Sequence, residues 1–127
     1  MIKEAYVSFE VAKLLKEKGF DEPIKCWYDN FQDFHEEGVR MSNTDCLPPT
    51  IMCPTHQMAM AWLREEKHIT FIISPQWAEG DMRNPCHWYW EIRGLDDISI
   101  DVYSQPLCST YEEAVEAACI YVLKNLL

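Results

Sequence analysis

The C-terminal part of the chain carries its clearest pattern, an apolar stripe at helical spacing that requires a second apolar surface to cover it. The stripe comprises Tyr111, Ala114, Val115, Ala118, Val122 and Leu126, and it is widened by Cys119 and Leu123. Ser109 and Glu112 have the spacing of a capping box, in which each side chain accepts from the other residue's backbone amide. The sequence therefore predicts a final helix that begins after Ser109 and buries one face.

Two more amphipathic helices are predicted earlier in the chain. In the first, Ser8 is a suitable N-cap and Gly19 is a suitable left-handed stop after the last turn. Its predicted buried side consists of Val11, Ala12, Leu14 and Leu15. The second helix is expected to begin at Thr55, to end near His68 and to bury Met58, Ala59, Ala61, Trp62 and Leu63.

Alternation of apolar and polar residues predicts strands at residues 69–74, 87–93 and 98–103, the last two joined by a turn at 94–97. We expect Pro75 to end the first of these strands, and Ile98, Ile100 and Val102 to face inward. A strand at residues 24–28 with a short partner at 39–41 comes earlier, and residues 43–54 are predicted to form an extended loop.

This order of elements contains few long crossovers between strands, which argues against a doubly wound parallel sheet. We expect one α+β domain over residues 1–127. Its three helices should pack mainly on one face of a small antiparallel or mixed sheet of about four to five strands. A chain of 127 residues is long enough to bury one hydrophobic core.

The chain is acidic, with 21 Asp and Glu against 11 Lys and Arg and a formal net charge of −10. Phosphate backbones repel such a surface and the basic residues are scattered, so direct nucleic-acid binding is not expected. The acidity either serves solubility or forms a decoy that occupies a nucleic-acid-binding protein. No apolar run approaches the roughly 20 residues that cross a bilayer, and residues 1–7 lack a signal-peptide core. We therefore expect a cytoplasmic protein without membrane contact.

Chemical motifs favour neither a metal site nor a catalytic centre. The six cysteines are expected to be reduced in the cytoplasm. Cys53 and His56 are the only pair at zinc-ligand spacing, whereas structural zinc sites usually use two such pairs. We expect no metal and no cofactor, and we interpret Cys53 as a loop cysteine beside a solvent-facing His56. Cys108 precedes the last helix, whose dipole favours a lower thiol pKa, but no local signature supplies a base.

The best candidate binding residues lie in the long irregular segment 29–53, where Phe31, Phe34 and His35 stand among acids. Trp77 lies in the loop predicted at residues 76–85, and both loops are expected to leave the same sheet and to form one rim. An apolar anchor framed by acids suits a basic or amphipathic partner. In the alternative interpretation, the two phenylalanines only cover the open edge of the sheet.

Four segments resemble small proteins encoded by phages and prophages of gut-type bacteria. They are SFEVAKLLKEKGF, PTHQMAMAWLREEKHITFI, the W-Y-W-E-I strand and STYEEAVEAACIYVLKNLL. The resemblance implies a mobile-element origin and brings no activity with it. It favours a non-enzymatic accessory protein that binds a host protein or a small signal molecule. A small enzyme with an active site assembled from loops stays open as the alternative, and converging polar groups with perturbed pKa values would favour it.

Overall fold

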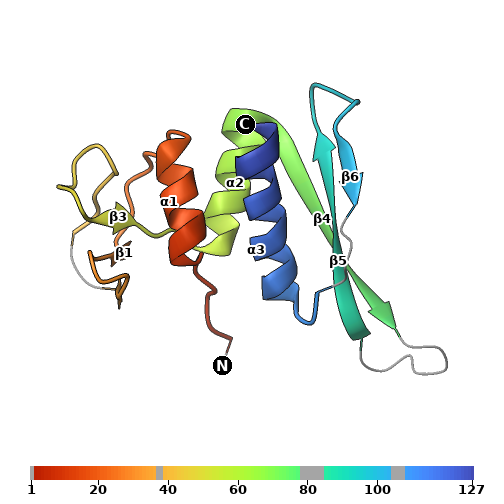
Figure 1. Ribbon diagram of the computed structural model, residues 1–127, viewed down its shortest axis with the longest axis horizontal. Coiled ribbons are helices and arrows are strands. Elements are labelled where there is room, and N and C mark those ends of the chain that lie inside the picture. The colour runs from red at the N-terminus through yellow and green to blue at the C-terminus, as the bar shows by residue number, and fades with distance from the viewer. Residues whose placement is uncertain (1, 37–38, 78–84, 104–107) are drawn as a thin grey trace.

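The computed structural model describes residues 2–36, 39–77, 85–103 and 108–127, and within them three helices lie between two small antiparallel sheets (Figure 1). The α+β class is confirmed. The expectation of one sheet with four to five strands is wrong, because two three-stranded sheets stand on opposite sides of the helices. No helix within the described residues is both long and apolar enough to cross a bilayer.

The second sheet has the order β4-β5-β6 and is built from β4 (Ile69–Trp77), β5 (Pro85–Gly94) and β6 (Asp101–Tyr103). Pro75 does not end β4, which continues to Trp77. A sheet edge tolerates proline because one side of an edge strand needs no hydrogen-bond donor. Ile98 is 95% exposed, contrary to expectation. The backbone N–H and hydroxyl of Ser99 both donate to Asp97, which keeps these residues in a turn before β6.

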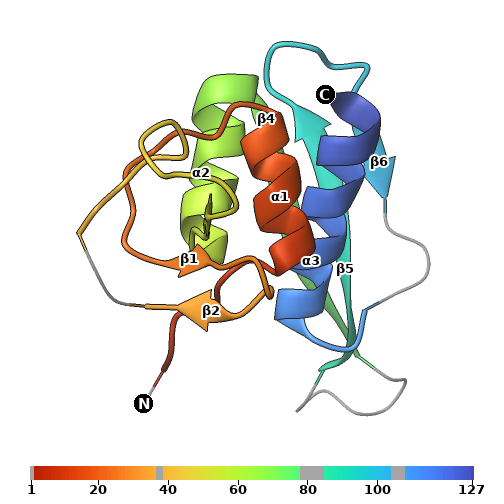
Figure 2. The same ribbon diagram turned by 60° about the vertical axis from the view of Figure 1, so that its left-hand side comes forward.

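The first sheet has the order β2-β1-β3 and is built from β1 (Trp27–Tyr28), β2 (Phe34–His35) and β3 (Ile51–Met52). Figure 2 shows β2 beside β1, below α1 and α2. The sequence prediction missed β2 and β3, because two residues are too few to show an alternating pattern. The partner strand predicted at residues 39–41 reduces to one bridge between Met41 and Ile24.

Helices α1 (Phe9–Glu17) and α2 (His56–Lys67) begin where the sequence predicted. The hydroxyl of Ser8 accepts from Val11 N at 3.2 Å, and the hydroxyl of Thr55 accepts from Met58 N at 3.1 Å. Gly19 has a φ of 99°, the left-handed conformation expected of a residue that ends a helix.

Helix α3 (Tyr111–Tyr121) continues into a π-helical turn, η1 (Val122–Leu126). Its N-cap is Thr110, one residue later than predicted. The Thr110 hydroxyl accepts from Glu113 N at 3.0 Å, and a Glu113 carboxylate oxygen accepts from Ser109 N at 2.9 Å. The predicted apolar stripe is confirmed, because six of its residues are fully buried: Ala114, Val115, Ala118, Cys119, Val122 and Leu123. Helix α3 packs on β4 and β5, while α1 packs between α3 and β3.

Candidate functional site

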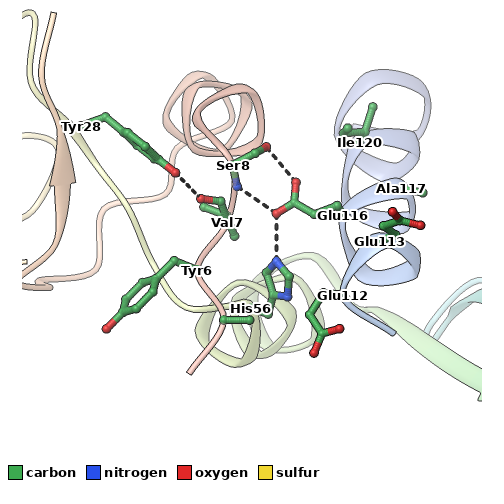
Figure 3. Close-up of a pocket in the computed structure, with 11 residues that line it drawn as sticks. Tyr6, Val7, Ser8, Tyr28, His56, Glu112, Glu113, Glu116, Ala117 and Ile120 are labelled. Atoms are coloured by element: carbon green, nitrogen blue, oxygen red, sulfur yellow. Dashed lines mark hydrogen bonds and ion pairs between the residues drawn. The ribbon is translucent and has the colours of Figure 1, made fainter. Parts of the chain in front are cut away.

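The starts of α1 and α2 and one side of α3 surround an open pocket of about 530 Å³, here called the polar pocket (Figure 3). Backbone pairing holds the two helix starts together. Val7 N donates to Pro54 O at 3.1 Å, and His56 N donates to Ala5 O at 2.8 Å. This pairing brings together two segments of the pocket wall, and Tyr28 and α3 supply the rest of it.

Glu116 of α3 is the centre of the polar pocket. One carboxylate oxygen accepts from Ser8 N at 2.8 Å and lies 2.8 Å from His56 Nε2, while the other accepts from the Ser8 hydroxyl at 2.7 Å (Figure 3). Burial acts to raise the pKa of Glu116, but the hydrogen bonds from His56 and Ser8 outweigh it, so the pKa is lowered. The side chain is therefore a carboxylate that ties α3 to the starts of α1 and α2.

His56 is the first residue of α2 and only 5% exposed, so its interpretation as a solvent-facing residue is wrong. A carboxylate has no proton to donate, and the short contact with Glu116 therefore requires the proton on Nε2. In a neutral ring Nδ1 is then an acceptor, and it is buried without a hydrogen-bond partner among the described residues. No local signal marks His56, because Glu116 stands 60 residues away in sequence.

The directions of the hydrogen bonds in the polar pocket argue against Ser8 as a nucleophile. A serine nucleophile requires a base that accepts its proton. The Ser8 hydroxyl instead donates to Glu116 and accepts from Val11 N, so it acts as a helix cap. Tyr28 also lines the pocket, and its hydroxyl donates to Val7 O at 2.7 Å. Burial, with smaller contributions from Cys53 and Glu116, raises the pKa of Tyr28, so its phenol stays protonated.

The first sheet has two different faces. Register pairs Trp27 with His35 and with Met52, which places these three side chains on one face. The Trp27 and His35 rings stack with centroids 4.0 Å apart. The next register pairs place Tyr28 and Phe34 on the opposite face, where Phe34 lies 4.9 Å from the Tyr6 ring.

Beside Trp27 and Met52 lies a second pocket of about 570 Å³, here called the apolar groove. Its wall includes Val39, which is 78% exposed, and Leu47, which is 81% exposed. The remaining lining residues are Met41, Asp45, Cys46 and Thr50. Five apolar side chains and one cysteine thus surround a concavity with a single carboxylate.

The predicted binding residues divide between several environments. Phe31 is 76% exposed in the turn between β1 and β2, whereas Phe34 packs against Tyr6 and Tyr28. His35 Nε2 lies 2.8 Å from a carboxylate oxygen of Asp29. The hydrogen bond from His35, assisted by backbone donors, lowers the pKa of Asp29. Because Asp29 holds the His35 ring and this ring stacks on Trp27, His35 positions Trp27 at the apolar groove.

Trp77 is 42% exposed at the end of β4, on the second sheet. The helices separate this sheet from the one that carries Phe31 and Phe34 (Figure 1). The expectation that both loops leave the same sheet is wrong, so a single rim formed by Phe31 and Trp77 lacks its structural basis. The rest of the loop expected around Trp77, residues 78–84, lies outside the described residues.

Neither Cys108 nor Cys53 shows an activated thiol. Burial, and then the charge of Glu113, raises the pKa of Cys108, opposite to the direction favoured by a helix dipole. Burial raises the pKa of Cys53 to about 12. Within the described part of the chain, no three His, Cys, Asp or Glu side chains gather as potential metal ligands.

Comparisons with protein-family models, with curated proteins and with solved structures found no match for this chain.

Proposed function

We propose that the protein is a non-enzymatic binding protein whose apolar groove holds a basic, amphipathic segment of a partner protein. The observation that carries the proposal is the exposure of Val39 and Leu47 on the wall of a concavity that also contains Trp27 and Met52. Apolar side chains gathered around a hollow are typical of binding sites. The resemblance to phage-encoded proteins makes a host protein the expected partner.

Charge supports a basic partner. Between residues 21 and 53, which include every lining residue of the groove, there are seven carboxylates and two cations. The carboxylates belong to Asp21, Glu22, Asp29, Asp33, Glu36, Glu37 and Asp45, and the cations to Lys25 and Arg40. This negative field accelerates the approach of a basic segment and repels an acidic one. The apolar side of the segment would then cover Leu47 and Val39.

Leu47 also sets the expected size of the change in binding affinity. Covering a side chain of this size stabilises a complex by about 1.5–3 kcal/mol, which is roughly a ten- to hundredfold change in the dissociation constant. Because Leu47 is 81% exposed in the free protein, its replacement should leave folding intact.

The test is a selection from a library of amphipathic peptides of graded net charge, followed by titration of the enriched peptides. We expect enrichment of basic peptides, weaker binding as salt increases, and at least a tenfold loss of affinity in Leu47→Ser. Ile98→Ser is the matched control, because Ile98 is even more exposed than Leu47 but lies beside the second sheet. Enrichment of acidic peptides, or equal affinities of the two variants, would contradict the proposal. Competition by duplex DNA for the same peptides would support the decoy interpretation.

A second candidate function is acid–base catalysis in the polar pocket. It is favoured by His56, whose Nε2–H is held by Glu116 while Nδ1 has no hydrogen-bond partner among the residues that the structure describes. A carboxylate that orients a histidine in this way is a common element of general-base sites. Its support is weaker, because Ser8 and Tyr28 already use their hydroxyl protons in other hydrogen bonds. Turnover of activated esters that disappears in His56→Asn and persists in His68→Asn would support catalysis; equal rates would exclude it.

A further inference from the structure

Cys26 and Cys53 lie directly opposite each other across the first sheet. The register of β1 and β3 pairs Trp27 with Met52, so one further step pairs Cys26 with Cys53. A backbone hydrogen bond from Cys53 N to Cys26 O, 2.9 Å long, confirms this pairing. Opposed residues of an antiparallel pair point to the same face, so the two thiols share the face opposite the apolar groove.

The spacing of such a pair suits a covalent bond between the sulfur atoms. Hydrogen-bonded partners in antiparallel strands have Cα atoms about 5.5 Å apart, which lies within the range that a disulfide spans. Both residues are free thiols in the structure. Burial is the main cause that raises the pKa of Cys53, and the nearby Cys26 thiol acts in the same direction.

The two thiols differ in how easily a reagent reaches them. Both line an open pocket of about 370 Å³ together with Lys25 and Arg40. Cys26 is 7% exposed and Cys53 is 1% exposed. Burial also keeps the Cys53 thiol protonated, whereas thiolates are the attacking species in disulfide exchange. Cys26 is therefore the first to react, and Cys53 is the second.

We infer that Cys26 and Cys53 are a redox-active pair that forms a cross-strand disulfide when a low-molecular-weight disulfide such as oxidised glutathione is the oxidant. The Cys26 thiolate attacks one sulfur of the oxidant, whose S–S bond breaks, and the departing glutathione thiolate takes up the proton released by Cys26. Cys53 then gives up its proton and attacks Sγ of Cys26, and the second glutathione leaves as a thiol that takes up this proton. Two protein thiols are oxidised and one glutathione disulfide is reduced to two thiols.

The inference does not depend on the proposed function, and a peptide map of the oxidised native protein tests it. Trypsin cleaves after Lys25, Arg40 and Arg64, so the disulfide joins peptide 26–40 to peptide 41–64. Peptide 41–64 also contains Cys46, which is 6% exposed and serves as the matched control. We expect the linked peptides in the wild type and in Cys46→Ser, in which Cys53 is the only thiol left in that peptide.

Cys53→Ser should lose the link and instead accumulate glutathione on Cys26, because the second step has no nucleophile. Absence of the link in Cys46→Ser, after an excess of oxidised glutathione has reached equilibrium with the native protein, would overturn the inference. The Cys46→Ser result does not require Cys53→Ser to fold, so it decides the matter by itself.

Discussion

Replacement of Glu116 by alanine should destabilise the protein more than its position on the side of a helix suggests. The carboxylate accepts three hydrogen bonds, two from Ser8 at 2.8 and 2.7 Å and one from His56 at 2.8 Å. A hydrogen bond to a charged group contributes about 1.5–3 kcal/mol when it is shielded from water. The Glu116 side chain is 22% exposed, and water can partly replace it at Ser8, but His56 is too buried for that. We therefore expect a loss of about 3 kcal/mol.

A loss of that size lowers the melting temperature of a domain of this length by roughly 10 °C. Thermal unfolding followed by circular dichroism measures it. Glu112→Ala is the matched control, because Glu112 lies one turn earlier on α3, also lines the polar pocket and is exposed. If Glu116→Ala and Glu112→Ala melt within two or three degrees of each other, the carboxylate does not hold the three helices together.

The same carboxylate predicts a pH dependence. Its pKa in the folded protein is below the ordinary value of 4.5, because His56 and Ser8 stabilise the ionised form more than burial destabilises it. A lowered pKa contributes stability above the ordinary value, and that contribution is lost as pH falls through the folded value. The stability difference between the wild type and Glu116→Gln should thus be largest near neutral pH and should shrink below pH 4.5. A difference that stays constant down to acid unfolding would contradict the assignment.

Three further experiments with substituted proteins test the fold. Ala118→Asp places a charge at a fully buried position of α3 and should unfold the domain or cost several kcal/mol; a variant that melts with the wild type would refute the helix packing. Thr110→Ala should lower the free energy of unfolding, measured with denaturant, by about 1 kcal/mol, and Ser109→Ala should lower it clearly less. The reverse order would show that Ser109 is the N-cap, as the sequence predicts. Phe31→Ala combined with Trp77→Ala should barely change the melting temperature, since both side chains are substantially exposed on different sheets; a loss of several kcal/mol would place them in the core.

The helices could be predicted from the sequence because each carries its own local information. Ser8 and Thr55 accept hydrogen bonds from amides three residues later, and Gly19 adopts the backbone angle that glycine tolerates best. These are interactions within one turn, so the sequence shows them directly. The error in the cap of α3, Ser109 in place of Thr110, arose because both residues are hydroxyl-bearing and each is followed three positions later by a glutamate.

The first sheet and the polar pocket could not be predicted in the same way. Strands β1, β2 and β3 have two residues each, so their pairing depends on contacts distant in sequence. Glu116 lies outside the apolar stripe that predicts the last helix, so no local pattern marks it as a site residue. Its carboxylate finds its partners far away in sequence, in Ser8, which is 108 residues earlier, and in the buried His56, which is 60 residues earlier. His56 was misplaced for the same reason, since the N-terminal segment that covers it comes from far away in sequence.

The opposite faces of the first sheet allow the two proposals to be tested independently. Trp27 and Met52 face the apolar groove, while their neighbours Cys26 and Cys53 point the other way. Leu47→Ser should therefore weaken peptide binding without slowing disulfide formation, because it removes nothing on the cysteine face. Cys53→Ser should abolish the disulfide and leave the affinity of the reduced protein for the peptide within about twofold, a change below 0.5 kcal/mol. If either variant changes both measurements, the two faces are coupled through strand pairing and cannot act as separate sites.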